Sequence, residues 1–282
     1  MNALPLQGLS SRVRLSQGTE MPVLGIGTFQ SEPGDATRNA VLWALEAGYR
    51  LIDTAALYEN EADVGAAIRQ SGLARESLFV TTKLWHTEHG YERAKRAFHA
   101  SLERLGLDYV DLYLIHWPRA DPPKERRESW RALEELKEEG VARAIGVSNY
   151  TIRHLEELAD ARIAPTVNQV EFHPFVYDPD LVDYCNAHAI RLEAYSPLTR
   201  NRRLDDRVVA EVAKARDHSP AQVLIRWGLQ HGAVEIPKST HRARIEENAR
   251  VFDFALSDAE MARLDGLRDR RRVTQWDPEQ IA

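Results

Sequence analysis

Short apolar runs alternate with amphipathic segments along most of the chain. Eight of these runs have the length and aliphatic composition of buried strands: residues 23–28, 50–53, 78–83, 110–116, 144–148, 166–171, 191–195 and 234–237. Most are followed by a segment with helical spacing of its apolar residues, as in W-R-A-L-E-E-L-K-E-E. Strands that alternate with helices pair in parallel, and eight such units in about 250 residues are typical of a barrel. The pattern therefore predicts an α/β protein with a (β/α)8 TIM-barrel fold.

The start of the chain predicts a β-hairpin before the barrel, because short apolar segments flank Gln17-Gly18-Thr19. We expect residues 1–11 to form a short N-terminal tail. Residues 12–282 should form one barrel domain, since no linker or break in composition interrupts them. An open, doubly wound sheet is the alternative architecture. It usually carries a G-x-G-x-x-G turn, and the segment G-I-G-T-F-Q lacks the third glycine.

Composition narrows the choice of partners. The 282 residues are 43% hydrophobic, as in a soluble globular protein, and the net charge is −6. Apart from the cluster Arg200 to Arg203, no basic field is available for nucleic acid or an anionic membrane, so small molecules are the expected partners. The single cysteine, Cys185, excludes an intrachain disulfide and favours a reducing compartment. The sequence also lacks the pattern of a signal peptide or a membrane span, and we expect a cytoplasmic protein, most simply a monomer.

Four polar residues stand at the predicted strand ends. Asp53 ends the second strand and Tyr58 follows it, while Lys83 and His116 end the third and fourth strands. Each has a structural explanation when taken singly, such as a capped turn, an internal salt bridge or a satisfied core histidine. In a barrel, however, the carboxyl ends of all strands face the same rim. The four side chains are therefore predicted to meet there.

This set suits the protonation of a carbonyl oxygen while a hydride reaches the carbonyl carbon. A lysine ammonium beside Tyr58 would favour the phenolate and lower the pKa of the phenol, and Asp53 would keep that lysine charged. Tyr58 is then the general acid. His116 should be neutral in so apolar a strand end and should orient the carbonyl oxygen by a hydrogen bond. Because no side chain can donate a hydride, the chemistry requires a nicotinamide cofactor.

The chain contains six ordered motifs between Met21 and Leu267. They are G-Y-R-L-I-D-T-A-A-L-Y-E-N-E, L-G-L-D-Y-V-D-L-Y-L-I-H-W-P, G-V-S-N, N-Q-V-E-F-H-P, A-Y-S-P-L and I-P-K-S-T-H-R-A-R-I-E-E-N. Together they resemble the aldo-keto reductase family, and the short C-terminal tail is similar to prokaryotic members such as the 2,5-diketo-gluconate reductases. The resemblance implies a (β/α)8 barrel that binds NADPH without a Rossmann fold and reduces aldehydes or ketones to alcohols. It also implies that Asp53, Tyr58, Lys83 and His116 are the catalytic tetrad.

The resemblance further implies a set of cofactor contacts. From the nicotinamide to the adenine these are Ser148, Asn149 and Gln169 on the carboxamide, Tyr195 against the ring, Gly27 and Thr28 near the ribose, Ser196 and Leu198 on the pyrophosphate, Lys238, Ser239 and Arg244 on the 2′-phosphate, and Glu247 and Asn248 at the adenine. Two departures stand out. The segment T-R-N-R-R-L-D-D replaces a Gly- or Ser-rich loop, which makes its arginines candidates for clamping the pyrophosphate. His241 stands where a hydroxyl residue often helps to hold the 2′-phosphate.

The substrate is expected to lie among four aromatic residues that follow strands or belong to the tail, namely Phe29, Trp85, Trp117 and Trp276. Sugar-derived diketones, α-keto aldehydes, and aromatic or aliphatic aldehydes all fit such a cleft. The intrinsic reactivity of aldehydes favours them as a class. The sequence does not choose among these substrates.

Other functions fit the sequence less well. His86 and His89 lack a suitably spaced acidic third ligand, so no metal site is expected. A serine hydrolase would need G-x-S-x-G, and Ser148 in G-V-S-N lacks the second glycine. The remaining alternative is a cofactor-binding sensor or structural protein with little turnover. Such proteins usually carry an interaction segment or a damaged tetrad, and neither is visible, which favours the enzyme.

Overall fold

The computed structural model describes residues 4–119, 122, 124–274 and 276–281, and its centre is a parallel sheet. The eight strands of this sheet are β3 (Gly25–Gly27), β4 (Leu51–Asp53), β5 (Phe79–Leu84), β6 (Val110–Ile115), β7 (Ala142–Ser148), β8 (Val167–Glu171), β9 (Arg191–Tyr195) and β10 (Val234–Glu235). They are hydrogen-bonded in sequence order, and every pair is parallel. All eight correspond to the runs predicted from the sequence, with ends that differ by a few residues.

The first and last strands come together and nearly close the sheet. Leu24 forms an isolated parallel bridge with Glu235, and the Gly27 amide donates to the Pro237 carbonyl over 3.2 Å. A Cβ atom at Gly27 would lie 2.8 Å from the Ile236 carbonyl oxygen, so this seam requires glycine. The prediction of a (β/α)8 barrel is confirmed.

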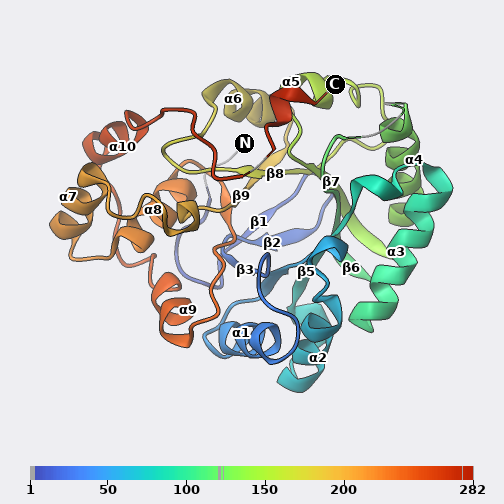
Figure 1. Ribbon diagram of the computed structural model, residues 1–282, viewed down its shortest axis with the longest axis horizontal. Helices are drawn as coiled ribbons and strands as arrows, with labels where there is room; N and C mark the ends of the chain where they lie inside the picture. The colour runs from blue at the N-terminus through green and yellow to red at the C-terminus, as the bar shows by residue number, and fades with distance from the viewer. Residues whose placement is uncertain (1–3, 120–121, 123, 275, 282) are drawn as a thin grey trace.

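Helices surround the barrel (Figure 1). They are α1 (Asp35–Glu46), α2 (Glu61–Ser71), α3 (Tyr91–Leu105), α4 (Glu125–Glu138), α5 (Ile152–Glu156), α6 (Pro179–Ala187), α7 (Arg207–Arg216), α8 (Pro220–Gln230), α9 (Arg242–Asn248) and α10 (Asp258–Asp265). Helix α3 illustrates why they pack inward. Ala94, Phe98, Leu102 and Leu105 recur every three or four residues and are buried, whereas the opposite face is charged.

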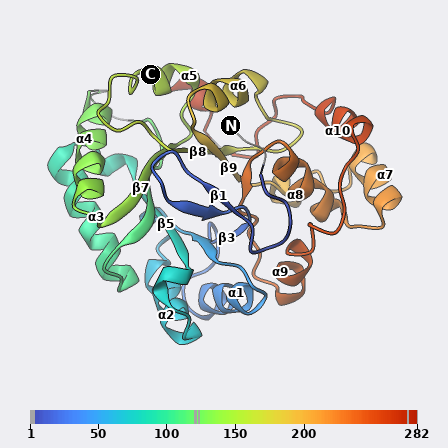
Figure 2. The ribbon, with the colours of Figure 1, turned by 180° about the vertical axis from the view of Figure 1, so that it is seen from behind.

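The expected hairpin is also present. Strands β1 (Arg12–Arg14) and β2 (Glu20–Pro22) are antiparallel and cross the amino-terminal end of the barrel, which Figure 2 shows from behind. The Gln17 side chain at its turn donates to the carbonyls of Ile145 and Ala164 over 3.2 and 2.7 Å. The hairpin thus closes one end of the barrel and leaves the carboxyl ends of the strands for a site.

Beyond α10 the chain returns across the barrel as a C-terminal tail that ends in a 3₁₀ turn, η5 (Pro278–Gln280) (Figure 1). Earlier in the chain, Leu4 is buried against the apolar core, before the hairpin begins. Within the described ranges, no helix has the length and apolar character that a membrane span requires.

Candidate active site

The turn after β4 places a phenol above the end of the barrel. β4 ends at Asp53, and a 3₁₀ turn spans Ala56–Tyr58. Asn60, which is fully buried, fixes this turn: its amide nitrogen donates to the Thr28 carbonyl over 3.0 Å, and its amide oxygen accepts from the Thr54 hydroxyl over 2.8 Å. The sequence predicted the helix that follows, but it did not assign this tethering role to Asn60.

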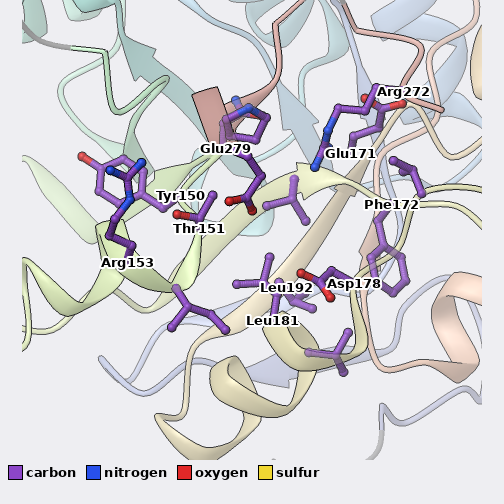
Figure 3. Close-up of a pocket in the computed structure, with 16 residues that line it drawn as sticks. Tyr150, Thr151, Arg153, Glu171, Phe172, Asp178, Leu181, Leu192, Arg272 and Glu279 are labelled. Atoms are coloured by element: carbon purple, nitrogen blue, oxygen red, sulfur yellow. The ribbon is translucent and has the colours of Figure 1, made fainter. Parts of the chain in front are cut away.

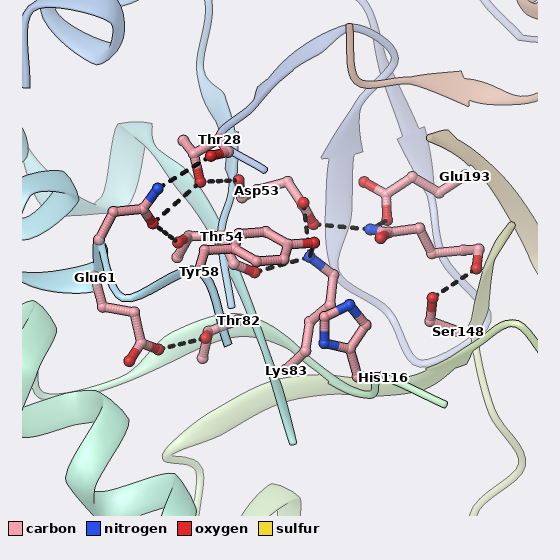
Figure 4. Close-up of polar contacts among 12 residues, drawn as sticks. Thr28, Asp53, Thr54, Tyr58, Glu61, Thr82, Lys83, His116, Ser148 and Glu193 are labelled. Atoms are coloured by element: carbon pink, nitrogen blue, oxygen red, sulfur yellow. Dashed lines mark hydrogen bonds and ion pairs between the residues drawn. The ribbon is translucent and has the colours of Figure 1, made fainter. Parts of the chain in front are cut away.

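The four residues of the predicted tetrad do meet at one rim (Figure 4). The Lys83 ammonium donates to Asp53 Oδ1 over 2.7 Å and to the Tyr58 hydroxyl over 3.2 Å. The rings of Tyr58 and His116 meet edge to face, with centroids 5.6 Å apart. Lys83 is fully buried beneath the phenol, so its charge acts in a medium that screens it weakly.

Burial dominates the acidity of these groups. It raises the pKa of Tyr58 to about 12, and Lys83 opposes this rise only in part. The expectation that Lys83 brings the pKa of Tyr58 below its ordinary value is therefore wrong for this arrangement, because desolvation of the phenolate outweighs the ammonium. Burial alone would lower the pKa of Lys83, but Asp53 and Tyr58 raise it above its ordinary value. Burial, with Lys83 nearby, holds the pKa of His116 well below its ordinary value, so the imidazole is neutral, as expected.

A second carboxyl group lies behind the tetrad. The side-chain nitrogen of Gln169 donates to Asp53 Oδ2 and to Glu193 Oε2, both over 2.8 Å (Figure 4). Burial, reinforced by the charge of Asp53, raises the pKa of Glu193 to about 8. Lys83 brings one positive charge to these two carboxyls, and the raised pKa means that Glu193 holds a proton at neutral pH. Glu193 was not predicted, although strand alternation puts it on the same face as Tyr195.

The ends of β6 to β9 are joined by a polar network. Asn149 adopts a left-handed conformation, with φ of 63°. Its amide nitrogen donates to the His116 carbonyl over 2.9 Å, and its amide oxygen accepts from the Tyr195 hydroxyl over 2.7 Å. The Ser148 hydroxyl donates to the Gln169 carbonyl over 2.8 Å. The four residues predicted at the nicotinamide thus form one connected group.

A cavity of about 480 Å³ lies above the tetrad. The predicted site residues that line it are Gly27, Phe29, Asp53, Tyr58, Trp85, His116, Trp117, Asn149, Gln169, Tyr195, Ser196, Leu198, Lys238 and Trp276. Those that do not line it are Thr28, Lys83, Ser148, Ser239, Arg244, Glu247 and Asn248. Its wall also includes Arg200, one of the arginines suggested for the pyrophosphate, and residues that the sequence did not single out: Gln30, Leu57, Pro197, Asn201, Ile236 and Thr274.

Aromatic rings form one side of this cavity. Trp85 and Trp276 are stacked, with centroids 5.7 Å apart and an angle of 19° between their planes. Trp117 meets Trp276 edge to face at 5.2 Å, and Phe29 lies 5.0 Å from Tyr58. Flat apolar surfaces next to a half-buried phenol suit a substrate with a carbonyl group on an apolar or aromatic body.

The arginine-containing loop lies at the edge of the same cavity. It contains a 3₁₀ turn, η4 (Thr199–Asn201), in which Arg200 has φ of 51°. The Arg200 guanidinium lies 5.2 Å from the centroid of the Phe29 ring, and Arg203 forms an ion pair with Asp269 over 3.0 Å. The loop therefore contacts both the segment after β3 and the C-terminal tail.

The residues predicted for the 2′-phosphate lie at the beginning of α9. Lys238 borders the cavity, whereas Arg244 is exposed on the helix. The Ser239 hydroxyl accepts a hydrogen bond from the His241 amide over 3.1 Å. Asn248 is buried at the end of α9. Of the three residues predicted for the 2′-phosphate, only Lys238 thus lines the cavity.

His86 and His89, the histidines considered for a metal site, lie in aromatic and buried surroundings. The His86 ring packs against Trp85, with centroids 4.5 Å apart. His89 is buried, and burial lowers its pKa to about 4. Among the residues that the structure describes, no three His, Cys, Asp or Glu side chains gather in a way that could hold a metal ion.

A nearly closed parallel barrel with tyrosine, lysine, aspartate and histidine at one rim, below an aromatic cavity, is typical of a carbonyl-reducing barrel oxidoreductase. The model of the Aldo/keto reductase family matches residues 23–269. The chain belongs to this family and is an NAD(P)H-dependent oxidoreductase.

Known proteins resemble the chain over nearly its whole length. Glyoxal reductase of Bacillus subtilis is 52% identical over 266 residues, which cover 94% of this chain and 95% of that protein. The crystal structure of an aldo-keto reductase from a Medee basin deep-sea metagenome library has a TM-score of 0.90 at 43% identity, and covers 94% of this chain and 98% of that one. A Bombyx mori aldo-keto reductase, solved in complex with NADP, has a TM-score of 0.88 at 35% identity, with 98% and 96% covered.

Proposed function

We propose that the protein reduces aldehydes, and more slowly ketones, to alcohols with NADPH, and that Tyr58 is the general acid. The observation that carries this proposal is the contact of the Tyr58 hydroxyl with the Lys83 ammonium, 3.2 Å away, at the floor of the aromatic cavity. A proton donor and a buried cation in contact at the floor of an apolar cavity suit carbonyl reduction.

The raised pKa of Tyr58 gives the acid a definite resting state. With a pKa of about 12, the phenol carries its proton at neutral pH. When it gives the proton to a carbonyl oxygen, the phenolate is left beside Lys83, whose charge Asp53 holds in place over 2.7 Å. Lys83 thus stabilises the charge that develops during proton transfer. Neutral His116, whose ring meets that of Tyr58 edge to face, would orient the carbonyl oxygen by a hydrogen bond.

The residues around the cavity fit a nicotinamide dinucleotide phosphate. When bound, NADPH supplies the hydride. Buried His116 Nδ1 has no hydrogen-bond partner within the described part of the chain, and Asn149 and Gln169 present amides to the same cavity. Lys238 supplies a cation on the wall that leads to Arg244. A guanidinium and an ammonium suit a phosphate dianion, and the Bombyx mori relative is complexed with NADP.

The remaining contacts that we propose for NADPH run from its nicotinamide end to its adenine end. Ser148, Asn149 and Gln169 would hold the carboxamide, and Tyr195 would lie against the nicotinamide ring. Beyond the ring, the proposed contacts are Gly27 and Thr28 at the ribose, Ser196 and Leu198 at the pyrophosphate, Ser239 with the two cations at the 2′-phosphate, and Glu247 and Asn248 at the adenine.

Aldehydes with a small apolar or dicarbonyl body are the proposed substrate class. Trp85, Trp117 and Trp276 offer flat apolar walls beside the acid. The relative that is 52% identical is named a glyoxal reductase, which favours α-dicarbonyl compounds among the substrates considered. Sugar-derived diketones such as 2,5-diketo-gluconate form the second class to compare.

A panel of carbonyl compounds tests this function. NADPH oxidation should be followed with glyoxal, methylglyoxal, aromatic aldehydes and sugar-derived diketones, and the classes ranked by kcat/KM. We expect turnover with several aldehydes and a preference for NADPH over NADH. Tight NADPH binding with very slow turnover across the whole panel would instead identify a cofactor-binding sensor.

A further inference from the structure

One buried carboxylate connects the barrel to the C-terminal tail. Glu171 is the last residue of β8, and its side chain is fully buried. Its Oε1 accepts from the Val273 amide over 2.6 Å and contacts His173 Nε2 at 3.0 Å. Its Oε2 accepts from the Thr274 hydroxyl over 2.6 Å and from the Thr274 amide over 3.4 Å. The tail residues are separated from Glu171 by about a third of the chain.

These bonds keep Glu171 ionised. Burial would raise its pKa, but the hydrogen bonds from His173, Thr274 and Val273 outweigh it and hold the pKa below its ordinary value. Hydrogen bonds to a charged acceptor are about twice as strong as neutral ones. The carboxylate is therefore a strong tether for the two tail residues that it contacts.

The tethered residues directly precede part of the cavity wall. Thr274 itself lines the cavity, and Trp276, two positions later, stacks on Trp85 and meets Trp117 edge to face. The position of Trp276 thus depends on where the backbone is held at Val273 and Thr274.

Apolar packing under the tail is incomplete, which increases the importance of this tether. A second cavity, of about 200 Å³, lies between the tail and the outer side of β8 and β9. Figure 3 shows the side chains that line it. Its tail side is formed by Arg272, Pro278 and Glu279, and its barrel side includes Val170 and Leu192. Side chains that line a space of this size lack van der Waals contacts that would otherwise hold the tail.

We propose that Glu171 is a positioning residue that determines substrate specificity, because it holds the tail so that Trp276 completes the aromatic wall. The inference rests on the proposed carbonyl reduction. A substrate with an aromatic ring gains from this wall, whereas glyoxal is too small to depend on it. Release of the tether should therefore weaken selection for aromatic carbonyls and leave proton transfer at Tyr58 unchanged.

The first test measures the order of the tail without any substrate. Arg270, Arg271 and Arg272 are trypsin sites next to the tether. Glu171→Gln and Thr274→Val should both be cleaved there faster than wild type, and Thr274→Val leaves the carboxylate and its contact with His173 intact. Glu134→Gln is the matched control, since buried Glu134 accepts from the Ile163 amide over 2.8 Å in a loop contact remote in sequence from the tail. It should be cleaved like wild type.

The second test compares phenylglyoxal with glyoxal. Glu171→Gln, Thr274→Val and Trp276→Ala should each reduce kcat/KM for phenylglyoxal by up to about tenfold through KM, as expected for one lost aromatic contact. For glyoxal, kcat of Glu171→Gln should stay near wild type, because Glu171 does not line the cavity. The Glu171→Gln/Trp276→Ala double variant should lose no more kcat/KM for phenylglyoxal than Trp276→Ala alone.

Unchanged trypsin cleavage and an unchanged phenylglyoxal to glyoxal ratio in Thr274→Val and Glu171→Gln would overturn the inference. An equal change in Glu134→Gln would do the same, because it would reveal general destabilisation. A wild-type protein that reduces no carbonyl would refute the proposed function instead, and the trypsin comparison would still decide whether Glu171 holds the tail.

Discussion

The Tyr58 hydroxyl lies 3.2 Å from the Lys83 ammonium, yet the pKa of the phenol is raised to about 12. Desolvation of the phenolate outweighs the attraction of the lysine. The lysine therefore does not ionise Tyr58 at rest. This relationship keeps the Tyr58 hydroxyl protonated at neutral pH, as the proposed role of general acid requires.

Replacement of the phenol tests its role directly. Tyr58→Phe should lower kcat for an aldehyde by about 10²–10⁴-fold, the usual contribution of a positioned acid, and should leave NADPH binding and thermal unfolding close to wild type. Tyr113→Phe is the control, because it removes the hydroxyl of a fully buried tyrosine on β6, which packs against Phe98 outside the cavity. Near-normal kcat in Tyr58→Phe would show that the proton comes from another group.

The buried ion pair makes a prediction about stability. In Lys83→Met the carboxylate of Asp53 loses its cation while remaining buried. Breaking one side of a buried pair costs about 3–5 kcal/mol, so urea unfolding should show a loss of this size in the free energy of unfolding. Lys83→Met combined with Asp53→Asn should recover part of it. This account would be contradicted if the double variant lost more free energy of unfolding than the two single variants lose together.

Glu193 makes a prediction about pH. Its pKa in the folded protein is about 8, against an ordinary value of 4.5. Between these values the folded protein holds a proton that the unfolded chain has released, so the contribution of Glu193 to stability is lost as pH rises through this range. Glu193→Gln removes this contribution. Urea midpoints measured from pH about 5 to about 8 should fall less steeply for the variant than for wild type; parallel curves would mean that Glu193 is already ionised.

Cofactor preference is predicted to depend on Arg244. A charge-assisted hydrogen bond is worth about 1.5–3 kcal/mol, and solvent exposure of Arg244 favours the lower figure. Arg244→Ala should weaken the binding of NADPH by roughly tenfold and leave the binding of NADH nearly unchanged. Both affinities can be titrated by tryptophan quenching. Arg242→Ala is the matched control on the same helix, since Arg242 pairs with Glu46 and Glu246. Equal losses for both cofactors would assign Arg244 a structural role.

The strand ends were predictable because one physical rule governs all of them. Runs of buried aliphatic residues mark parallel strands, and the residue that follows each run lies at the common rim. Lys83 and His116 could thus be placed together from sequence alone. The aromatic residues Trp85 and Trp117 follow by the same rule, because Trp85 comes two residues after Lys83 and Trp117 directly follows His116.

Contacts that depend on packing could not be predicted in this way. The acidity of Tyr58 reflects a balance between burial and a neighbouring charge, and sequence gives only the neighbour. The tether from Glu171 to Thr274 depends on the path of the tail over the rim, which no periodic pattern encodes. The sequence suggested Trp276 for the cavity as an aromatic residue of the tail, and the structure shows Glu171 bonded to Val273 and Thr274 just before it.

The seam of the barrel joins its first and last strands, since β3 and β10 meet at Leu24 and Glu235. Phe29 follows the first strand, whereas Lys238 and Trp276 follow the last, and all three line one cavity. A nascent chain on the ribosome therefore cannot form the proposed NADPH site until the segment after β10 has emerged. Prematurely terminated chains would neither sequester the cofactor nor gain the stabilisation that ligand binding gives to a finished protein.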